Sequence, residues 1–236
     1  MIKTQIHQLN SQFYARFAQD FSATRQRIQP GVNTVLEGVS RTASILDLGC
    51  GNGSVVRSLA GRGHKGSYLG IDFSEELITI ARSTQTHPEA HFIAADLCNP
   101  EWSVEVQAGF EQVFCFAALH HIPGMEERLR VVQQAASLMA DQAGMTVSVW
   151  NFLASPRLKK RILPWSVINI ADEDVDPGDY LLDWRRGGSG IRYVHHFTEE
   201  ELGKLAEAAG LQVVGTFYSD GENGRLGMYQ RWINTR

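Results

Sequence analysis

The sequence has few cysteines and no long apolar run. Its three cysteines, Cys50, Cys98 and Cys115, form no Cys-x-x-Cys pair and are odd in number, so we expect reduced thiols and a cytoplasmic protein. The longest apolar run, Val113 to Leu119, is far shorter than the roughly 20 residues of a membrane-spanning helix. The first residues lack the apolar stretch of a secretory signal. The sequence therefore predicts neither a membrane span nor export.

Positive charge is also scarce. The formal net charge of −4 gives no global case for binding nucleic acid. The charge is unevenly distributed, however: residues 1–43 hold five Lys and Arg against two acids, residues 151–197 hold seven against six, and the rest holds ten against eighteen. This partition can guide an anionic substrate to one face, although a solvated surface of mixed charge explains it equally well.

From Ser44 onward, short apolar segments alternate with amphipathic ones. This pattern is typical of an α/β protein whose parallel strands are covered by helices on both faces. The expected strands are 44–49, 66–71, 91–95, 110–116, 143–150, 211–218 and 226–233. The expected helices are 54–62, 74–84, a short one near 101–108, 125–140 and 198–209. The Gly- and Asn-containing turn at 220–224 allows the last two strands to pair as an antiparallel hairpin.

Two segments do not follow this alternation. We expect residues 1–43 to form an N-terminal helical flank of two helices, and residues 44–236 to form one domain. Within that domain, residues 151–197 are interrupted by Pro and Gly and contain a basic run at 157–161. We interpret them as an insertion of short helices and loops above the carboxyl ends of the strands, where it serves as a substrate lid.

A glycine-rich turn follows the first expected strand. The run Ile-Leu-Asp-Leu-Gly-Cys-Gly-Asn-Gly-Ser at 45–54 reads as strand, turn and helix start, where backbone N–H groups can face a ligand. A redox dinucleotide fingerprint requires Gly or Ala at position 54, where this chain has Ser54, and no Gly-Lys-Ser/Thr is present for a P-loop. Asp72 ends the second strand, where a ribose needs an acceptor for its hydroxyls.

These motifs, with Ile-Asp-Phe-Ser at 71–74, resemble those of the S-adenosylmethionine (SAM)-dependent methyltransferases over residues 44–150 and 198–236. The resemblance implies a Rossmann-like sheet of seven strands, mostly parallel, with an antiparallel final hairpin. It implies SAM as cofactor and S-adenosylhomocysteine as product. The cofactor-binding residues it implies are Gly49 and Gly51 at the methionine part, Asp72 at the ribose, Phe73 beside adenine, Asp96 at the adenine amino group, and Cys50, Leu97 and Ala117. Asp47 either contacts the cofactor or orients the glycine loop.

A narrower resemblance includes the insertion. Leu-His-His at 119–121, Gly-Asp-Tyr-Leu-Leu-Asp-Trp at 178–184, Arg-Tyr-Val-His-His-Phe at 192–197 and Tyr-Ser-Asp-Gly-Glu-Asn at 218–223 resemble the tRNA wobble-uridine carboxymethyl methyltransferases. That family methylates the carboxylate of 5-carboxymethyluridine. The resemblance implies tRNA as a partner and leaves open a small activator subunit. The chain departs from the family where an arginine pair becomes Glu127-Arg128 and where Asn-Trp becomes Asn223-Gly224.

A carboxylate acceptor is already ionised at pH 7, so it needs positioning more than a general base. Arginine forks suit that task. The positioning candidates are Arg25, His120 and Arg192, and the substrate-binding candidates are Arg27, Arg128, Tyr193, His195, Asp220 and Asn223. The competing interpretations are a solvated surface for the arginines, packing for the histidines and Tyr193, and a simple turn for Asp220 and Asn223. We expect no metal site, because no carboxylate or Cys lies at ligand spacing from His120 and His121.

Two other functions are compatible with the sequence. One is a small-molecule methyltransferase of the quinone or metabolite type, which the acidic overall charge favours. The other is a SAM-binding protein without catalysis. The residues of the insertion and the charge partition favour tRNA.

Overall fold

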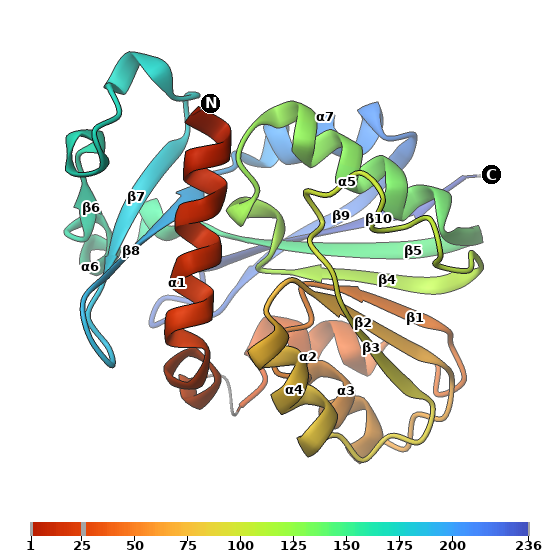
Figure 1. Ribbon diagram of the computed structural model, residues 1–236. Coiled ribbons are helices and arrows are strands. Elements are labelled where there is room, and N and C mark those ends of the chain that lie inside the picture. Colours follow the sequence, from red (N-terminus) through yellow and green to blue (C-terminus); the bar gives the residue numbers. More distant parts are fainter. Residues whose placement is uncertain (1, 25–26, 236) are drawn as a thin grey trace.

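The computed structural model describes residues 2–24 and 27–235. In this part of the chain, seven strands form one sheet in the order β3-β2-β1-β4-β5-β10-β9 (Figure 1). Strand β10 is antiparallel to both of its neighbours, whereas the pairs among β1 to β5 are parallel. The expected fold is confirmed. The strands of this sheet are β1 (Ile45–Leu48), β2 (Tyr68–Asp72), β3 (Ala90–Ala94), β4 (Phe110–Phe116), β5 (Met139–Trp150), β9 (Leu211–Ser219) and β10 (Gly227–Asn234).

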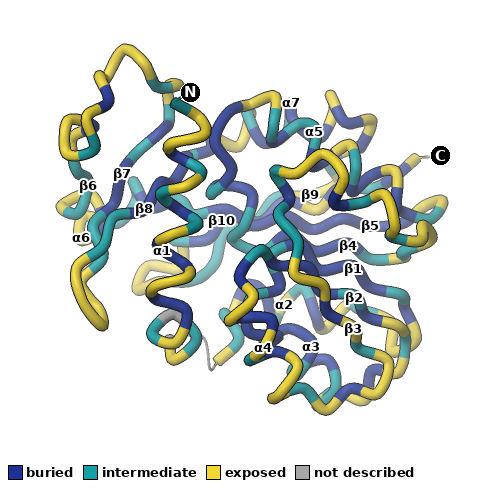
Figure 2. Tube along the Cα trace, in the orientation of Figure 1, coloured by how far each residue is buried: buried dark blue, intermediate teal, exposed yellow. Residues whose placement is uncertain are grey.

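Helices cover both faces of this sheet. Neighbouring residues of a strand point to opposite faces, and accordingly Ile45 packs with residues of α2, α3 and α4, whereas Leu46 packs with residues of α5 and α7. Figure 2 shows the central strands buried between these layers. The helices are α2 (Pro30–Glu37), α3 (Ser54–Gly61), α4 (Glu75–Thr84), α5 (Met125–Ser137) and α7 (Glu199–Ala208).

Helices α4 and α7 each begin with a capping side chain. The hydroxyl of Ser74 accepts a hydrogen bond from the backbone N–H of Leu77, and that of Thr198 accepts one from Glu201. Each cap satisfies an N–H group that the first helical turn leaves unpaired, and acids in that turn oppose the helix dipole. These caps fix where the chain leaves β2 and where it returns from the insertion.

Two expectations of local structure are wrong. Residues 101–108 form turns and not a short helix. The insertion contains, besides short helices, an antiparallel sheet in the order β6-β7-β8. Of the glycines that suggested loop, Gly187 and Gly188 lie in the turn of a β7–β8 hairpin, and Gly190 begins β8 opposite Trp184. The elements of the insertion are η2 (Phe152–Ala154), α6 (Pro156–Lys159), β6 (Ile162–Leu163), η3 (Trp165–Ile168), η4 (Asp172–Asp174), β7 (Asp179–Trp184) and β8 (Gly190–His195).

Helix α1 (Ile2–Thr24), with a kink at Phe17, lies between the small sheet and the large one (Figure 1). Asn10 fastens it to β8, because its amide donates to the carbonyl of Tyr193 at 3.2 Å and accepts from the N–H of Tyr193 at 2.8 Å. The same amide donates to the carbonyl of His121 at 3.0 Å. Helix α1 therefore joins the insertion to the core. Among the described residues, no helix is long and apolar enough to cross a membrane.

Candidate functional site

A cavity of about 580 Å³ lies at the carboxyl ends of the core strands, bounded by α1 and the insertion. Its volume is in the range of small-molecule sites. Every residue that the sequence assigned to the cofactor lines this one cavity: Asp47, Gly49, Cys50, Gly51, Asp72, Phe73, Asp96, Leu97 and Ala117.

The glycine turn after β1 is held against the end of β2. The N–H groups of Gly49 and Cys50 donate to the carbonyl of Ile71 at 2.7 and 3.0 Å. Gly49 has a φ of +75°, and a Cβ there would lie 2.4 Å from the Cβ of Ala118. Gly51 has a φ of +54°, and a Cβ there would meet no atom within 4 Å. The backbone at Gly51 therefore borders open space, on the side where the resemblance assigns the methionine part of SAM.

Asp72 is the central carboxylate of this region. Its Oδ2 accepts the N–H of Gly51 at 2.9 Å, and its Oδ1 accepts the N–H of Ser74 at 3.0 Å. Burial raises the pKa of Asp72, although these two hydrogen bonds oppose the rise. Each carboxylate oxygen has two lone pairs and can accept a second hydrogen bond. Asp72 thus orders the glycine turn and can also hold ribose hydroxyls.

Asp47 and Asp96 differ in their surroundings. Asp47 is fully buried, accepts a hydrogen bond from the hydroxyl of Tyr68, and has its pKa raised by burial to about 7. Asp96 forms an ion pair with His7 of α1, at 3.0 Å between Oδ2 and Nε2, and accepts the N–H of Cys98 at 2.8 Å. Burial alone would raise the pKa of Asp96, but these hydrogen bonds hold it below its usual value. The hydrogen bond to Asp96 raises the pKa of His7 to about 10.

The ligand atoms of His7, Asp96 and Cys98 lie within 4.8 Å of one another. Among the described residues, they form the one group of three or more His, Cys, Asp or Glu side chains close enough together to hold a metal ion. In this arrangement the imidazole of His7 faces the carboxylate that the resemblance assigns to the adenine amino group. The ion pair therefore lies in the cavity wall.

Helix α1 lines the cavity with residues that the sequence reasoning missed: His7, Asn10, Ser11 and Tyr14. Their spacing of three or four residues places them on one face of a helix. That polar stripe was the signal that could have revealed them, because a helix that only packs on a core presents apolar residues at this spacing. The N-terminal flank is therefore part of the site.

Arg192 lies in the cavity wall and is 4% exposed. Its guanidinium stacks on the ring of Trp150, with its central carbon 4.4 Å from the ring centroid, and lies 5.3 and 5.7 Å from the centroids of Trp184 and Phe13. These residues come from β8, β5, β7 and α1. Such aromatic contacts stabilise a buried cation through the negative faces of the rings.

His121, and not His120, belongs to the residues that line the cavity. His120 is fully buried and packs against Trp150, with ring centroids 5.5 Å apart. The Nδ1 of His121 faces the carbonyl of Tyr193 at 3.0 Å, and its Nε2 faces the hydroxyl of Tyr14 at 2.8 Å. Since a carbonyl can only accept, neutral His121 carries its proton on Nδ1 and accepts from Tyr14 at Nε2.

Three candidate substrate-binding residues meet in a buried network away from the cavity lining. Arg128 is 1% exposed and pairs with Asp179 at 3.8 Å and with Glu201 at 3.7 Å. His195 bridges the same two carboxylates at 2.7 and 2.8 Å, and the Tyr193 hydroxyl donates to Asp179 at 2.7 Å. Burial alone would lower the pKa of His195, but the hydrogen bonds to both carboxylates raise it overall. This network ties the insertion to α5 and α7.

The remaining candidates are dispersed. Arg27 lines the cavity and is exposed. Asp220 also lines it, and its carboxylate accepts from the N–H of Gly31 at 2.9 Å and from the hydroxyl of Tyr229 at 2.6 Å. Asn223 is exposed in the turn after β9, where its side chain accepts the N–H of Arg225. Arg25 lies outside the described residues.

Comparisons with known proteins identify the family of this chain. The family model described as a methyltransferase domain matches residues 6–216. The ubiquinone biosynthesis O-methyltransferase of Chromobacterium violaceum is 26% identical over 184 residues, which are 75% of this chain and 69% of that protein. The tRNA (carboxymethyluridine(34)-5-O)-methyltransferase of Arabidopsis thaliana is 26% identical over 167 residues, which are 70% of this chain and 38% of that protein. The chain spans about a third of the length of other curated relatives that it matches.

Solved structures share the fold. A putative methyltransferase of Haloferax volcanii, in complex with the Trm112 methyltransferase activator, has a TM-score of 0.68 at 14% identity and is matched over 97% of this chain and 98% of its own. The magnesium protoporphyrin IX methyltransferase of Synechocystis, with bound SAM, has a TM-score of 0.59 at 18% identity and is matched over 98% of this chain and 96% of its own. This chain belongs to the methyltransferase-domain family and is a class I SAM-dependent methyltransferase.

Proposed function

We propose that this enzyme methylates the carboxylate of 5-carboxymethyluridine at the wobble position of tRNA. The observation that carries the proposal is Arg192, a buried cation on the wall of the same cavity that holds the cofactor residues. A fixed guanidinium at this place suits an anionic acceptor. The name of the Arabidopsis relative supports the same substrate. Such a substrate implies a cytoplasmic enzyme.

When bound, SAM would supply a methyl group on a positively charged sulfur. A carboxylate oxygen can attack such a methyl carbon, and the sulfur leaves with the bonding electrons as S-adenosylhomocysteine. Because the acceptor is already ionised at pH 7, no side chain has to remove a proton. The protein has to hold the carboxylate oxygen in line with the methyl group, because holding two reacting groups in the right geometry lowers the activation barrier. Aromatic rings stack on the faces of the guanidinium plane, whereas the N–H groups that bind a carboxylate lie at the edge of that plane. Trp150 and Trp184 can therefore hold Arg192 while its edge serves the acceptor.

The test uses SAM labelled in its methyl group and tRNA that carries 5-carboxymethyluridine. We expect label in tRNA that mild alkali releases, because an ester is hydrolysed under conditions that leave a methyl ether intact. Arg192→Lys should raise KM for tRNA about tenfold, or roughly 1.4 kcal/mol, while Kd for SAM stays within twofold. Arg231→Lys on β10, at an exposed position, is the matched control. Absence of alkali-labile label in tRNA would refute the proposal.

A second candidate function is O-methylation of a phenolic or hydroxyl small molecule of the quinone type. The observation in its favour is the Tyr14–His121 pair in the cavity wall. A phenol must lose its proton during transfer, and a neutral imidazole is a base suited to that step. The name of the Chromobacterium relative supports this candidate. Alkali-stable label that enters a lipid extract, and that His121→Asn abolishes, would identify it.

A small activator subunit is a proposed partner. The support is the Haloferax structure, in which a protein of this fold is bound to such a subunit. The purified chain should then methylate tRNA poorly by itself, and addition of the subunit should raise kcat/KM. Full activity of the chain alone would contradict this part of the proposal.

A further inference from the structure

The insertion carries more arginines than one acceptor carboxylate can use. Besides Arg192, four of them line the cavity, and together with Arg27 from the segment before α2 they are defined here as the basic rim: Arg27, Arg157, Arg161, Arg185 and Arg186. A single carboxylate is satisfied by one or two guanidinium groups. Arg192 already lies deeper in the wall, so the rim has a different task.

The charges that line the cavity are segregated by origin. Its aspartates come from the ends of β1 and β2, from the segment after β3 and from the β9–β10 turn, at Asp47, Asp72, Asp96 and Asp220. The rim arginines come from the insertion, apart from Arg27 in the segment before α2. Lys159 and Lys160 come two and three residues after Arg157 and are exposed. The insertion thus presents positive charge beside a cavity whose cofactor end is acidic.

One carboxylate organises two of the rim arginines. Asp183 of β7 pairs with Arg161 at 3.9 Å and also with Arg185, which is 71% exposed at its side chain. Pairs as exposed as this add little stability. Their effect is to hold two guanidinium groups beside each other. Because Asp183 supplies one negative charge against the five arginines of the rim, the rim stays positively charged.

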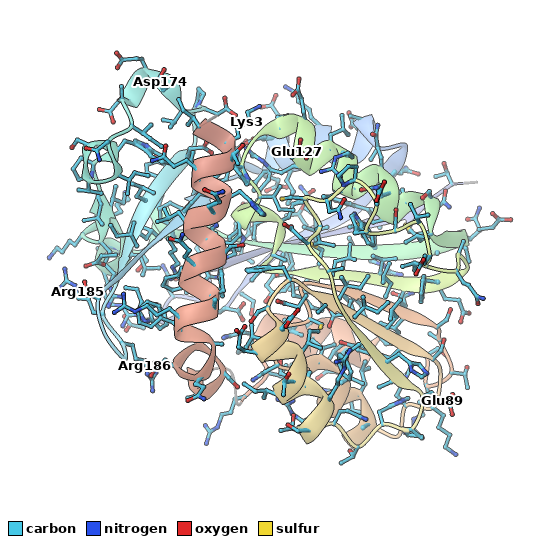
Figure 3. All side chains as sticks on the ribbon, in the orientation of Figure 1. Lys3, Glu89, Glu127, Asp174, Arg185 and Arg186 are labelled. Atoms are coloured by element: carbon cyan, nitrogen blue, oxygen red, sulfur yellow. The ribbon has the colours of Figure 1, made fainter. Side chains whose placement is uncertain are left out.

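The insertion is also polarised along its length. Its acidic residues at 172–174 and 176 lie in and next to η4. Figure 3 shows Asp174 at one end of the insertion and Arg185 and Arg186 at the other. A solvated surface of mixed charge would intersperse the two signs, whereas this arrangement directs an anion to the end that borders the cavity.

We propose that the basic rim binds the phosphates of a single RNA strand on either side of the nucleotide that enters the cavity. This rests on the proposed function for the identity of that nucleotide. Arginine forks bind phosphate oxygens in pairs, and several such contacts in a row make affinity depend strongly on salt. Sequence-specific RNA enzymes act on splayed, single-stranded nucleotides, whose flanking phosphates need such a surface.

The test compares two double charge reversals in the full-length protein. Arg185→Glu with Arg186→Glu removes part of the rim, and Arg41→Glu with Lys65→Glu changes the charge equally at exposed positions before β1 and β2, at the opposite edge of the sheet. Fluorescence anisotropy with a labelled anticodon stem-loop lacking the modification measures RNA binding without any chemistry. We expect Kd to rise at least tenfold in the rim variant and less than threefold in the control, with a smaller salt dependence in the rim variant.

Two outcomes overturn the proposal. One is a rim variant that binds the stem-loop as tightly as the control does. The other is unmodified protein that binds polyglutamate of the same charge as tightly as RNA, which would make the rim a docking site for acidic proteins. If the rim variant loses RNA affinity but no carboxymethyluridine is methylated by the unmodified enzyme, the proposed function fails while the RNA surface stands. If the unmodified enzyme methylates carboxymethyluridine but the rim variant keeps its RNA affinity, the proposed function stands and the RNA surface fails.

Discussion

The two halves of the cavity are built in different ways. The cofactor half consists of strand ends, backbone N–H groups and short acidic side chains, such as Gly51 donating to Asp72 at 2.9 Å. The acceptor half consists of long side chains from separate elements, such as Arg192 of β8 stacked on Trp150 of β5 at 4.4 Å. A backbone turn is specified by a few consecutive residues, whereas a stacked cluster depends on how distant segments pack. The cofactor half is therefore generic, and the acceptor half carries what is particular to this enzyme.

The largest expected effect concerns the network that attaches the acceptor half. Arg128→Met should lower the free energy of unfolding by about 3–5 kcal/mol, because buried Asp179 and partly buried Glu201 lose their arginine and share only His195. Thermal and urea unfolding measure this, while calorimetry on the folded fraction should show unchanged Kd for SAM. Intact stability together with a raised KM for the acceptor would mean that Arg128 serves the substrate, as the sequence predicted.

The second effect is a pH dependence of stability that comes from Asp47 in the cofactor half. Burial raises the pKa of Asp47 to about 7, above its value in the unfolded chain, so the folded protein binds more protons between about pH 4 and pH 7. Stability contributed by this group is thus lost as pH rises through that window. Asp47→Asn should remove about 2–3 kcal/mol of the difference in unfolding free energy between pH 5 and pH 8. Equal pH profiles for the two proteins would show that Asp47 is ionised at little cost.

The third effect concerns the cofactor half alone. Asp72→Asn should weaken SAM binding about 30-fold, or roughly 2 kcal/mol, because hydrogen bonds to a charged acceptor are replaced by weaker ones. Calorimetry with SAM and with S-adenosylhomocysteine measures it. Asp141→Asn, at an exposed position of β5, is the control. Unaltered affinity in Asp72→Asn would remove this carboxylate from the cofactor site.

The smallest effect compares two glycines with the same backbone demand. Gly51 and Gly63 both have positive φ and no atom within 4 Å of an added Cβ. Each change to Ala should cost about 1 kcal/mol of stability. Only Gly51→Ala should also weaken SAM binding, because only its Cβ enters the cavity. Similar SAM affinities in both variants would place the cofactor away from this turn.

The sequence predicted which residues of the proposed cofactor half lie together. Strand β1, the glycine turn, Asp72 and Asp96 are encoded by short-range patterns, and Gly49, Gly51 and both of these acids line one cavity. The acceptor half was less accessible, because the partners of Tyr193 and His195 are Asp179 and Glu201, and only tertiary packing brings them together. Their resemblance to a motif said nothing about which way their side chains point.

The small sheet was missed for a related reason. Its strands alternate weakly, and its glycines were read as loop because a hairpin is recognised only when both of its strands are. His121 was passed over for its neighbour, since two adjacent histidines cannot be ranked before the backbone shows which one faces the cavity. The cavity-lining face of α1 could have been predicted from the spacing of its polar residues.

Helix α1 has a mechanical consequence. It supplies His7 beside Asp96 and Tyr14 beside His121, and Asn10 fastens it to β8. A displacement of this one helix would therefore disturb both ends of the cavity wall at once.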